Sequence, residues 1–183
     1  MNVKMKKIIL SAACVFFMNI LFAQKILVPQ DEDSKVHFVI RNFGIKTGGD
    51  LSGLKGTIRF DPVNILVWSF DVTVASSTIN TDNETRDKHL KKDDYFDVAR
   101  HPVLHMLSTK IEATETQGIY RFTGTLTIKG VTKPVQFPFK VNKLKDGYVF
   151  SGEFSINRLD FGIGSSSISL ADDLKVSLKV FAR

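Results

Sequence analysis

Strict alternation of apolar and polar residues is the feature that most constrains the fold of this chain. Three segments show it cleanly, at residues 135–141, 148–156 and 174–181, and five show it less regularly, at 36–40, 54–60, 66–74, 104–111 and 120–128. A period of two places successive side chains on opposite faces of a strand, so each segment buries one face. The pattern predicts an all-β chain of about eight strands.

The links between these segments favour antiparallel neighbours. Asp146-Gly147 is a strong hairpin motif, Lys129-Gly130 is a weaker one, and residues 116–118 suit a short loop. A sheet with one apolar face and no helices to cover it hides that face by curling into a barrel. We therefore expect an eight-stranded antiparallel up-and-down barrel, with an aligned sandwich as the alternative that periodicity leaves open.

The N-terminus is typical of an export signal. Lys4, Lys6 and Lys7 precede the apolar stretch 8–23, which as a helix is about 24 Å long and short of the ~30 Å core of a bilayer. We expect residues 1–23 to be a cleaved signal peptide and residues 24–183 to form one periplasmic or secreted domain without a transmembrane segment. A membrane anchor and a lipoprotein acylated at Cys14 are the alternatives.

Charge and composition exclude several classes. Removal of residues 1–23 takes away three Lys and the single Cys, so 22 basic residues face 19 acidic ones, and no thiol chemistry remains. No basic run with interleaved aromatics indicates nucleic-acid binding. The polar strand face carries Lys140, Lys175 and Lys179, which is unfavourable against lipid, so this face should point into water and the apolar face inward.

The predicted inward face is rich in aromatic residues. They are Trp68, Phe70, Phe122, Phe137, Phe139, Phe150 and Phe154. A barrel of about eight strands can fill with its own side chains or keep a cavity for a small apolar ligand. Composition leaves both open.

One charged segment, residues 82–97, is predicted to form a short helix that covers one end of the barrel. Thr81 and Glu84 fit a capping box that starts the helix at about residue 82. Arg86, His89 and Leu90 would share a face. The segment is interpreted as a lid in which Arg86 pairs with an acid and Asp87 caps backbone. In the alternative, Arg86 or His89 contacts the polar head of a ligand.

The sequence gives little indication of a catalytic or metal-binding site. Ser76 or Ser77 with His89 and Asp87 supplies the residue types of a hydrolase, but the G-x-S-x-G turn is missing. His101 and His105 have i, i+4 spacing, but Pro102 interrupts the helix that would align them. We expect no enzyme activity, no metal and no cofactor.

Four sequence blocks resemble a known family. They are "SKVHFVIRNFG" (34–44), "STINTDNETRDKHLKKDDYFDVARHP" (77–102), "GTLTIKGVTKPVQFPF" (124–139) and "INRLDFGIG" (156–164). In this order and spacing they are similar to the YceI-like lipid and polyisoprenoid-binding proteins of bacteria. The sequence departs from the family pattern at Asn42, at residues 78–81 and at Met106. The resemblance implies a lipocalin-like barrel, an apolar tunnel for a long isoprenoid or acyl chain with its polar head near one end, and no catalytic residue.

The sequence thus predicts an exported protein that binds an isoprenoid or fatty amphiphile, with a homodimer possible. A structural or stress-response domain with a solid core, or a periplasmic enzyme, are the alternatives. The predicted ligand-binding residues are Trp68, Phe70, Arg86, His89, Met106, Phe122, Leu126, Ile128, Phe137, Phe139, Val141, Phe150 and Phe154.

Overall fold

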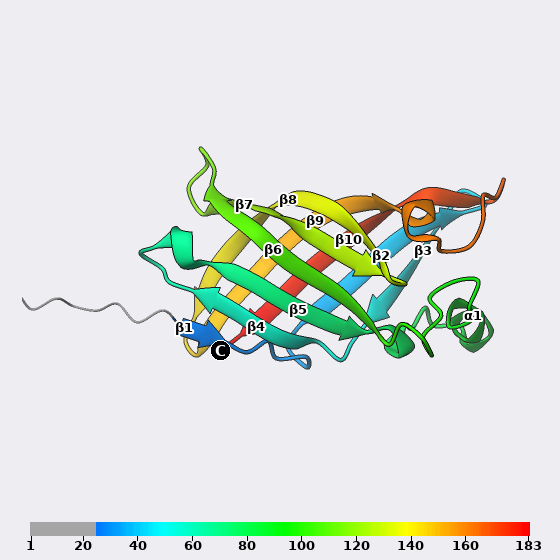
Figure 1. The fold of residues 1–183 in the computed structure, drawn as a ribbon, viewed down its shortest axis with the longest axis horizontal. Coiled ribbons are helices and arrows are strands. Elements are labelled where there is room, and N and C mark those ends of the chain that lie inside the picture. The colour runs from blue at the N-terminus through cyan, green and yellow to red at the C-terminus, as the bar shows by residue number, and fades with distance from the viewer. Residues whose placement is uncertain (1–24) are drawn as a thin grey trace, which may run out of the picture.

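The computed structural model describes residues 25–183. The predicted signal peptide, residues 1–23, lies outside this range. The described chain is almost entirely β-structure (Figure 1). Its strands are β1 (Lys25–Leu27), β2 (Lys35–Asn42), β3 (Ile45–Leu51), β4 (Lys55–Phe60), β5 (Ser69–Ala75), β6 (Val103–Ala113), β7 (Ile119–Ile128), β8 (Val131–Leu144), β9 (Gly147–Asn157) and β10 (Leu170–Ala182). The helical pieces are α1 (Glu84–Leu90) and the single-turn 3-10 helices η1 (Ile65–Val67), η2 (Ser76–Thr78) and η3 (Arg158–Phe161).

All ten strands belong to one antiparallel sheet. The strand order is β1-β4-β5-β6-β7-β8-β9-β10-β2-β3, so β4 to β10 follow one another as in an up-and-down meander. The hairpin β2–β3 lies beside β10, and β1 lies beside β4. The sheet is strongly curled and forms a half-barrel (Figure 1). The buried apolar residues lie on its concave face.

Backbone hydrogen bonds outside the regular strand pairs close the curl at two places. The backbone N–H groups of Val28 and Gln30 donate to the carbonyls of Arg183 and Phe181 at 2.8 Å, next to the pairing of β1 with β4. At the other end, Asp50 and Asn80 exchange backbone hydrogen bonds of 2.8 and 3.0 Å. These hydrogen bonds use backbone N–H and C=O groups that would otherwise be unpaired at exposed strand edges.

The predicted all-β antiparallel class is confirmed, whereas the predicted eight-stranded barrel is a strongly curled half-barrel of ten strands. The eight predicted segments all contain strands, and β1 and β3 are additional. β1 has only three residues, and β3 contains Gly48 and Gly49, so neither shows a clear alternation. The Gly49 position needs a small residue, because a β-carbon there would lie 2.5 Å from the Phe38 ring.

The helix begins two residues later than predicted, and its cap is a different residue. The side chain of Asn83 accepts a hydrogen bond of 2.9 Å from the Arg86 N–H, whereas Thr81 lies before the helix and is buried. The helix ends at Leu90, and turns rather than helix continue to residue 100. Figure 1 shows α1 at the end of the sheet that also carries η3 and the tip of the β2–β3 hairpin.

We expect Asn83→Ala to lower the free energy of unfolding by about 1 kcal/mol, because it removes the N-cap acceptor of α1. Urea denaturation followed by circular dichroism measures this change. Asn83→Asp is the matched control, since it keeps an acceptor at the same position. Equal unfolding midpoints for the Ala and Asp variants would contradict the assigned cap.

Candidate functional site: an apolar cavity beside a packed aromatic core

One half of the concave space, which we call the filled half, is occupied by aromatic rings. They come from β4 to β9 and from the η1–β5 segment, and they are Phe60, Trp68, Phe70, Tyr120, Phe122, Phe137, Phe139, Tyr148 and Phe150. Trp68 lies 4.5 Å from Phe60 between ring centroids, and Phe70 lies 5.3 Å from Phe150. Such edge-to-face and tilted contacts are those that aromatic pairs prefer. The filled half is therefore a solid core.

Glycines on the inward face make room for these rings. A β-carbon at Gly152 would lie 3.1 Å from the Phe137 ring, and one at Gly124 would lie 2.8 Å from the Phe122 ring. Gly152 on β9 is the register partner of Phe139 on β8. The Phe137 ring thus lies over the backbone of the neighbouring strand β9 and the Phe122 ring over the backbone of its own strand, which helps so many rings fit on one sheet.

The other half of the concave space holds a cavity of about 340 Å³. Its walls are mostly aliphatic side chains from strands on both sides of the curl: Val36, Phe38, Ile40, Leu51, Leu54, Val72, Val74, Leu104, Met106, Leu126, Ile128, Phe154, Ile156, Leu174, Val176, Leu178 and Val180. Volumes of this size are in the range of small-molecule sites. Phe154, stacked on Phe137 with centroids 4.6 Å apart, lies at the boundary between cavity and filled half.

The structure separates the predicted ligand-binding residues into two groups. Arg86, His89, Met106, Leu126, Ile128 and Phe154 line the cavity. Trp68, Phe70, Phe122, Phe137, Phe139 and Phe150 belong to the filled half, and Val141 packs against that core from β8. Whether any of them binds a ligand stays a prediction.

Sequence reasoning missed most of the wall from β2 and β10. Val36 and Ile40 on β2 and Leu174, Val176 and Leu178 on β10 line the cavity, and none was among the predicted site residues. Their alternation is visible in the sequence, but the predicted site consists mainly of aromatic residues on the inward face. Aliphatic side chains are shorter than rings, so the strands that carry them leave the space open.

The α1 segment forms one end of the cavity. Arg86, His89 and Leu90 all line it, as the predicted shared helix face requires, together with Tyr95 and Phe96. The side chain of His89 is half exposed, so this end of the cavity lies next to the protein surface, and we call it the mouth. The His89 ring lies 4.7 Å from the Tyr95 ring and 3.9 Å from a carboxylate oxygen of Asp94.

Arg86 is held by Thr81 rather than by the predicted acid. Its Nε donates to the Thr81 hydroxyl and its Nη2 to the Thr81 carbonyl, both at 2.7 Å. Asp87 in turn accepts from the Thr81 N–H at 3.0 Å, in agreement with its predicted role as a backbone cap. Arg86 and Thr81 also line a second, polar hollow of about 330 Å³ next to the cavity, which includes Lys46 and Asn80. The guanidinium thus lies between an apolar and a polar space.

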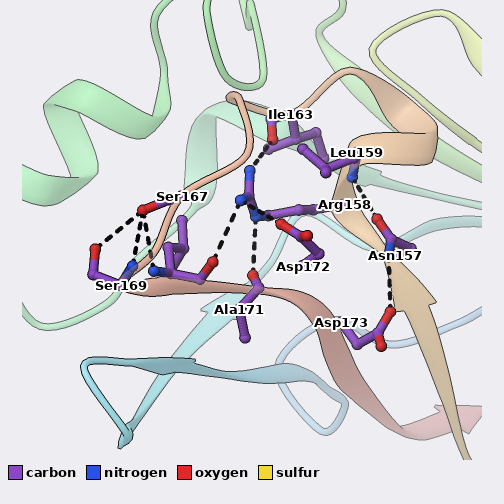
Figure 2. A network of polar contacts seen from close by, with 10 residues as sticks. Asn157, Arg158, Leu159, Ile163, Ser167, Ser169, Ala171, Asp172 and Asp173 are labelled. Atoms are coloured by element: carbon purple, nitrogen blue, oxygen red, sulfur yellow. Dashed lines mark hydrogen bonds and ion pairs between the residues drawn. The ribbon is translucent and has the colours of Figure 1, made fainter.

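Arg158 also lines the cavity and is the centre of a polar network (Figure 2). It is 2 % exposed, and its Nη2 lies 2.7 Å from a carboxylate oxygen of Asp172. Its Nε and Nη1 donate to the carbonyls of Ala171 and Ile163 at 3.0 and 2.9 Å. A buried arginine is stable only when paired and hydrogen-bonded in this way. It ties η3 to the start of β10 and fixes the loop between them.

Perturbed carboxylates lie on the outer face, away from the cavity. A hydrogen bond from Lys110 lowers the pKa of Glu112, and hydrogen bonds from Lys175 and Ser177 lower the pKa of Glu153. Both groups are solvent-accessible strand residues. Glu112 pairs with Lys110 on the same strand, Glu153 pairs across β9 and β10, and the two carboxylates do not converge on a reaction centre.

The residues considered for hydrolysis have other partners. The Ser76 hydroxyl donates to the His101 carbonyl at 2.7 Å, Asp87 accepts from Thr81, and His89 approaches Asp94. Within residues 25–183, no group of three or more His, Cys, Asp and Glu side chains is arranged to hold a metal ion. In the same range, no helix is long and apolar enough to cross a membrane.

Comparisons with known proteins agree with this architecture. Residues 28–182 match the model of the YceI-like domain family. The crystal structure of the YceI protein of Campylobacter jejuni is similar, with 33% identity, a TM-score of 0.65 and coverage of 73% of this chain and 82% of the other. BcnA of Burkholderia cenocepacia shares the fold at 24% identity, with a TM-score of 0.78 and coverage of 83% and 98%.

A third similar structure is a polyisoprenoid binding domain from Saccharophagus degradans that is implicated in plant cell wall breakdown. It is 13% identical, with a TM-score of 0.70, and the match covers 88% of this chain and 99% of that domain. At this identity the likeness is one of fold. The family match over nearly the whole described chain, with the curled sheet and its aromatic core, confirms the resemblance inferred from the sequence: this chain belongs to the YceI-like domain family.

Proposed function

We propose that this protein binds an isoprenoid or another amphiphilic lipid, with the chain in the cavity and the polar head at the mouth. The observation that carries the proposal is the cavity itself, whose walls are aliphatic on strands from both sides of the curl. The polyisoprenoid-binding domain with the same fold supports the ligand class. The proposed location is the periplasm or the exterior, and the proposed role requires no catalytic step.

The cavity volume sets the enclosed length of the ligand. A methylene group occupies about 30 Å³, similar to a water molecule in the liquid. A cavity of 340 Å³ therefore has room for roughly 11 methylene groups. Burial at about 0.8 kcal/mol per CH₂ gives roughly 9 kcal/mol before the entropy of ordering is subtracted. A longer isoprenoid would keep part of its chain outside the mouth.

The mouth supplies groups for a polar head. Arg86 and His89 face the cavity, and the polar hollow beside them contains Lys46 and Asn80. The Thr81 contacts hold the guanidinium in place without neutralising its charge. The same hollow also contains Asp50 and Asp82, so Arg86 and Lys46 supply the positive charges for an anionic or hydroxyl head group, and the two acids restrict where it binds.

Two experiments test the proposal. Mass spectrometry of an organic extract of the protein purified from its own host should reveal a copurified lipid, and an extract without one counts against the carrier role. The second is a titration with cis-parinaric acid, a fatty acid whose fluorescence rises in apolar sites. The Val176→Phe variant should bind it at least about tenfold more weakly, because the added ring occupies the space of the chain.

Ser177→Phe is the matched control for this titration. Ser177 neighbours Val176 on β10 but lies on the outer face, where its hydroxyl donates to Glu153 at 3.0 Å. The control should bind the probe as the unmodified protein does. Equal affinities for both variants would show that the fatty acid binds elsewhere.

A further inference from the structure

Three large apolar side chains are exposed at the end of the sheet that also carries α1. Phe43 is 80% exposed, Ile45 is 70% exposed and Ile168 is fully exposed. Phe43 and Ile45 lie at the tip of the β2–β3 hairpin, and Ile168 lies in the loop between η3 and β10. The Phe43 N–H donates to the Ser169 carbonyl at 2.7 Å, so tip and loop are joined. Figure 1 shows both at the same end of the sheet.

The backbone at Phe43 is strained. Phe43 and Gly44 form the two-residue turn of the hairpin with φ angles of +49° and +77°. Asn, Asp or Gly usually occupies such positions, because a larger residue is disfavoured at positive φ. The Phe43 ring gains no core packing in return, since it is exposed. Lys129 has a similar φ angle of +50° in the β7–β8 turn, so the conformation alone assigns no role to Phe43; its exposed ring does add apolar area at the tip.

This apolar cluster adjoins the cavity. Asn42 and Leu170 are register partners at the ends of β2 and β10, and both line the cavity. Phe43, Ile45 and Ile168 therefore lie within two residues along the chain of side chains that line the cavity. A lipid that leaves a bilayer at this point would remain in contact with apolar side chains.

The charges next to the hairpin tip are positive, whereas those next to the loop are acidic: Asp160 and Asp173 are exposed, and Asp172 is paired with Arg158. Arg41 and Lys46 face each other across the hairpin, and both are exposed. The stretches 42–45 and 163–169 contain no charged residue. Apolar side chains at the tip and cations one position behind match the acyl and headgroup layers of an anionic bilayer.

We propose that Phe43, Ile45 and Ile168 form a membrane-docking tip that inserts into an anionic lipid surface, with Arg41 and Lys46 at the headgroups. The tip brings the mouth to the bilayer, where the cavity exchanges its lipid. The loading role rests on the proposed function, whereas insertion itself does not depend on it.

The opposite end of the sheet offers a matched control. Leu66 in η1 is 89% exposed, comparable to Phe43, but η1 lies at the far end from the mouth in Figure 1. If exposure of an apolar side chain were sufficient for membrane insertion, both residues would insert into the bilayer. Docking through the tip makes only position 43 insert.

The test places a tryptophan at each position. The chain has one tryptophan, Trp68, which is 7% exposed inside the filled half, so a second one reports its own surroundings. Phe43→Trp and Leu66→Trp are mixed with vesicles of phosphatidylethanolamine and phosphatidylglycerol whose acyl chains are brominated. Quenching is expected at position 43 and not at position 66. Because the reporter is local, the apolar segment 8–23 of the full chain does not contribute.

Charge and loading are tested separately. Arg41→Gln with Lys46→Gln should weaken binding to these anionic vesicles about tenfold and leave binding to neutral phosphatidylcholine vesicles unchanged. Phe43→Ser with Ile45→Ser and Ile168→Ser should slow the transfer of cis-parinaric acid from vesicles about tenfold or more. The same triple variant should bind that probe from solution with unchanged affinity.

The outcomes distinguish the two proposals. Quenching that is equal at positions 43 and 66, or absent at both, overturns the docking tip. A protein that inserts through position 43 but binds no cis-parinaric acid from solution keeps the docking tip and loses the proposed lipid-carrier function. Val176→Phe should still insert, because its substitution lies inside the cavity.

Discussion

Phe139→Ala is expected to lower the free energy of unfolding by about 3–5 kcal/mol. Phe139 is 4% exposed in the filled half, and its ring lies 5.5 Å from Phe70 and 5.7 Å from Tyr120 between centroids. Its removal leaves an empty space among rings that are held by strands on several sides and cannot collapse into it. Urea denaturation measures the change, and a charged residue at this position should prevent folding.

Phe154→Ala is the matched control for Phe139→Ala. Phe154 is also a phenylalanine on an inward face, but it is only partly buried and borders the cavity. Its truncation should cost clearly less stability than Phe139→Ala and should enlarge the space for a ligand. Equal losses of stability in the two variants would contradict the division of the concave space into a filled half and a cavity.

Arg158→Met is expected to lower the free energy of unfolding by about 3 kcal/mol. Removal of one member of a buried charge pair typically costs about 3–5 kcal/mol, because the partner is left without compensation. Asp172 is 37% exposed and keeps some contact with water, which places the loss at the lower end. The carbonyls of Ile163 and Ala171 also lose their charged donor.

The controls for Arg158 separate charge from geometry. Arg158→Lys keeps the charge but not the planar fork that reaches two carbonyls and a carboxylate, so an intermediate loss is expected. Lys88→Ala removes an exposed partner of Glu84 and should change stability by about 0.5 kcal/mol or less. If Arg158→Met were as stable as Lys88→Ala, the network in Figure 2 would have no structural role.

The two halves of the concave space also bear on the alternative functions. A structural domain with a solid core describes the filled half well, but it does not explain the aliphatic cavity beside it. An enzyme would place several polar groups around a common point. Here Arg86 and His89 lie at the edge of an apolar space, where Arg86 is hydrogen-bonded to Thr81 and His89 lies 3.9 Å from Asp94. The lipid extract remains the decisive measurement between the carrier and the structural role.

The sequence predicted the fold class, the faces of the strands and several turns. The alternation at residues 135–141 and 174–181 corresponds to β8 and β10, and Asp146-Gly147 lies at the β8–β9 turn. These features depend on local geometry, since a period of two and the chemistry of a turn are set within a few residues. β3 was missed because Gly48 and Gly49 carry no pattern, although its pairing with β2 holds it in the sheet.

Periodicity determined on its own which residues point inward, but only the tertiary structure decided what each inward residue does. Phe139 and Phe154 have the same pattern along their strands, yet one lies within a set of interlocking rings and the other lies beside a cavity. That difference depends on which side chains face each other across the curl, from strands far apart in the chain. The same applies to Arg158. The Ile163 carbonyl and the Asp172 carboxylate come within reach of its guanidinium only when η3 packs against β10.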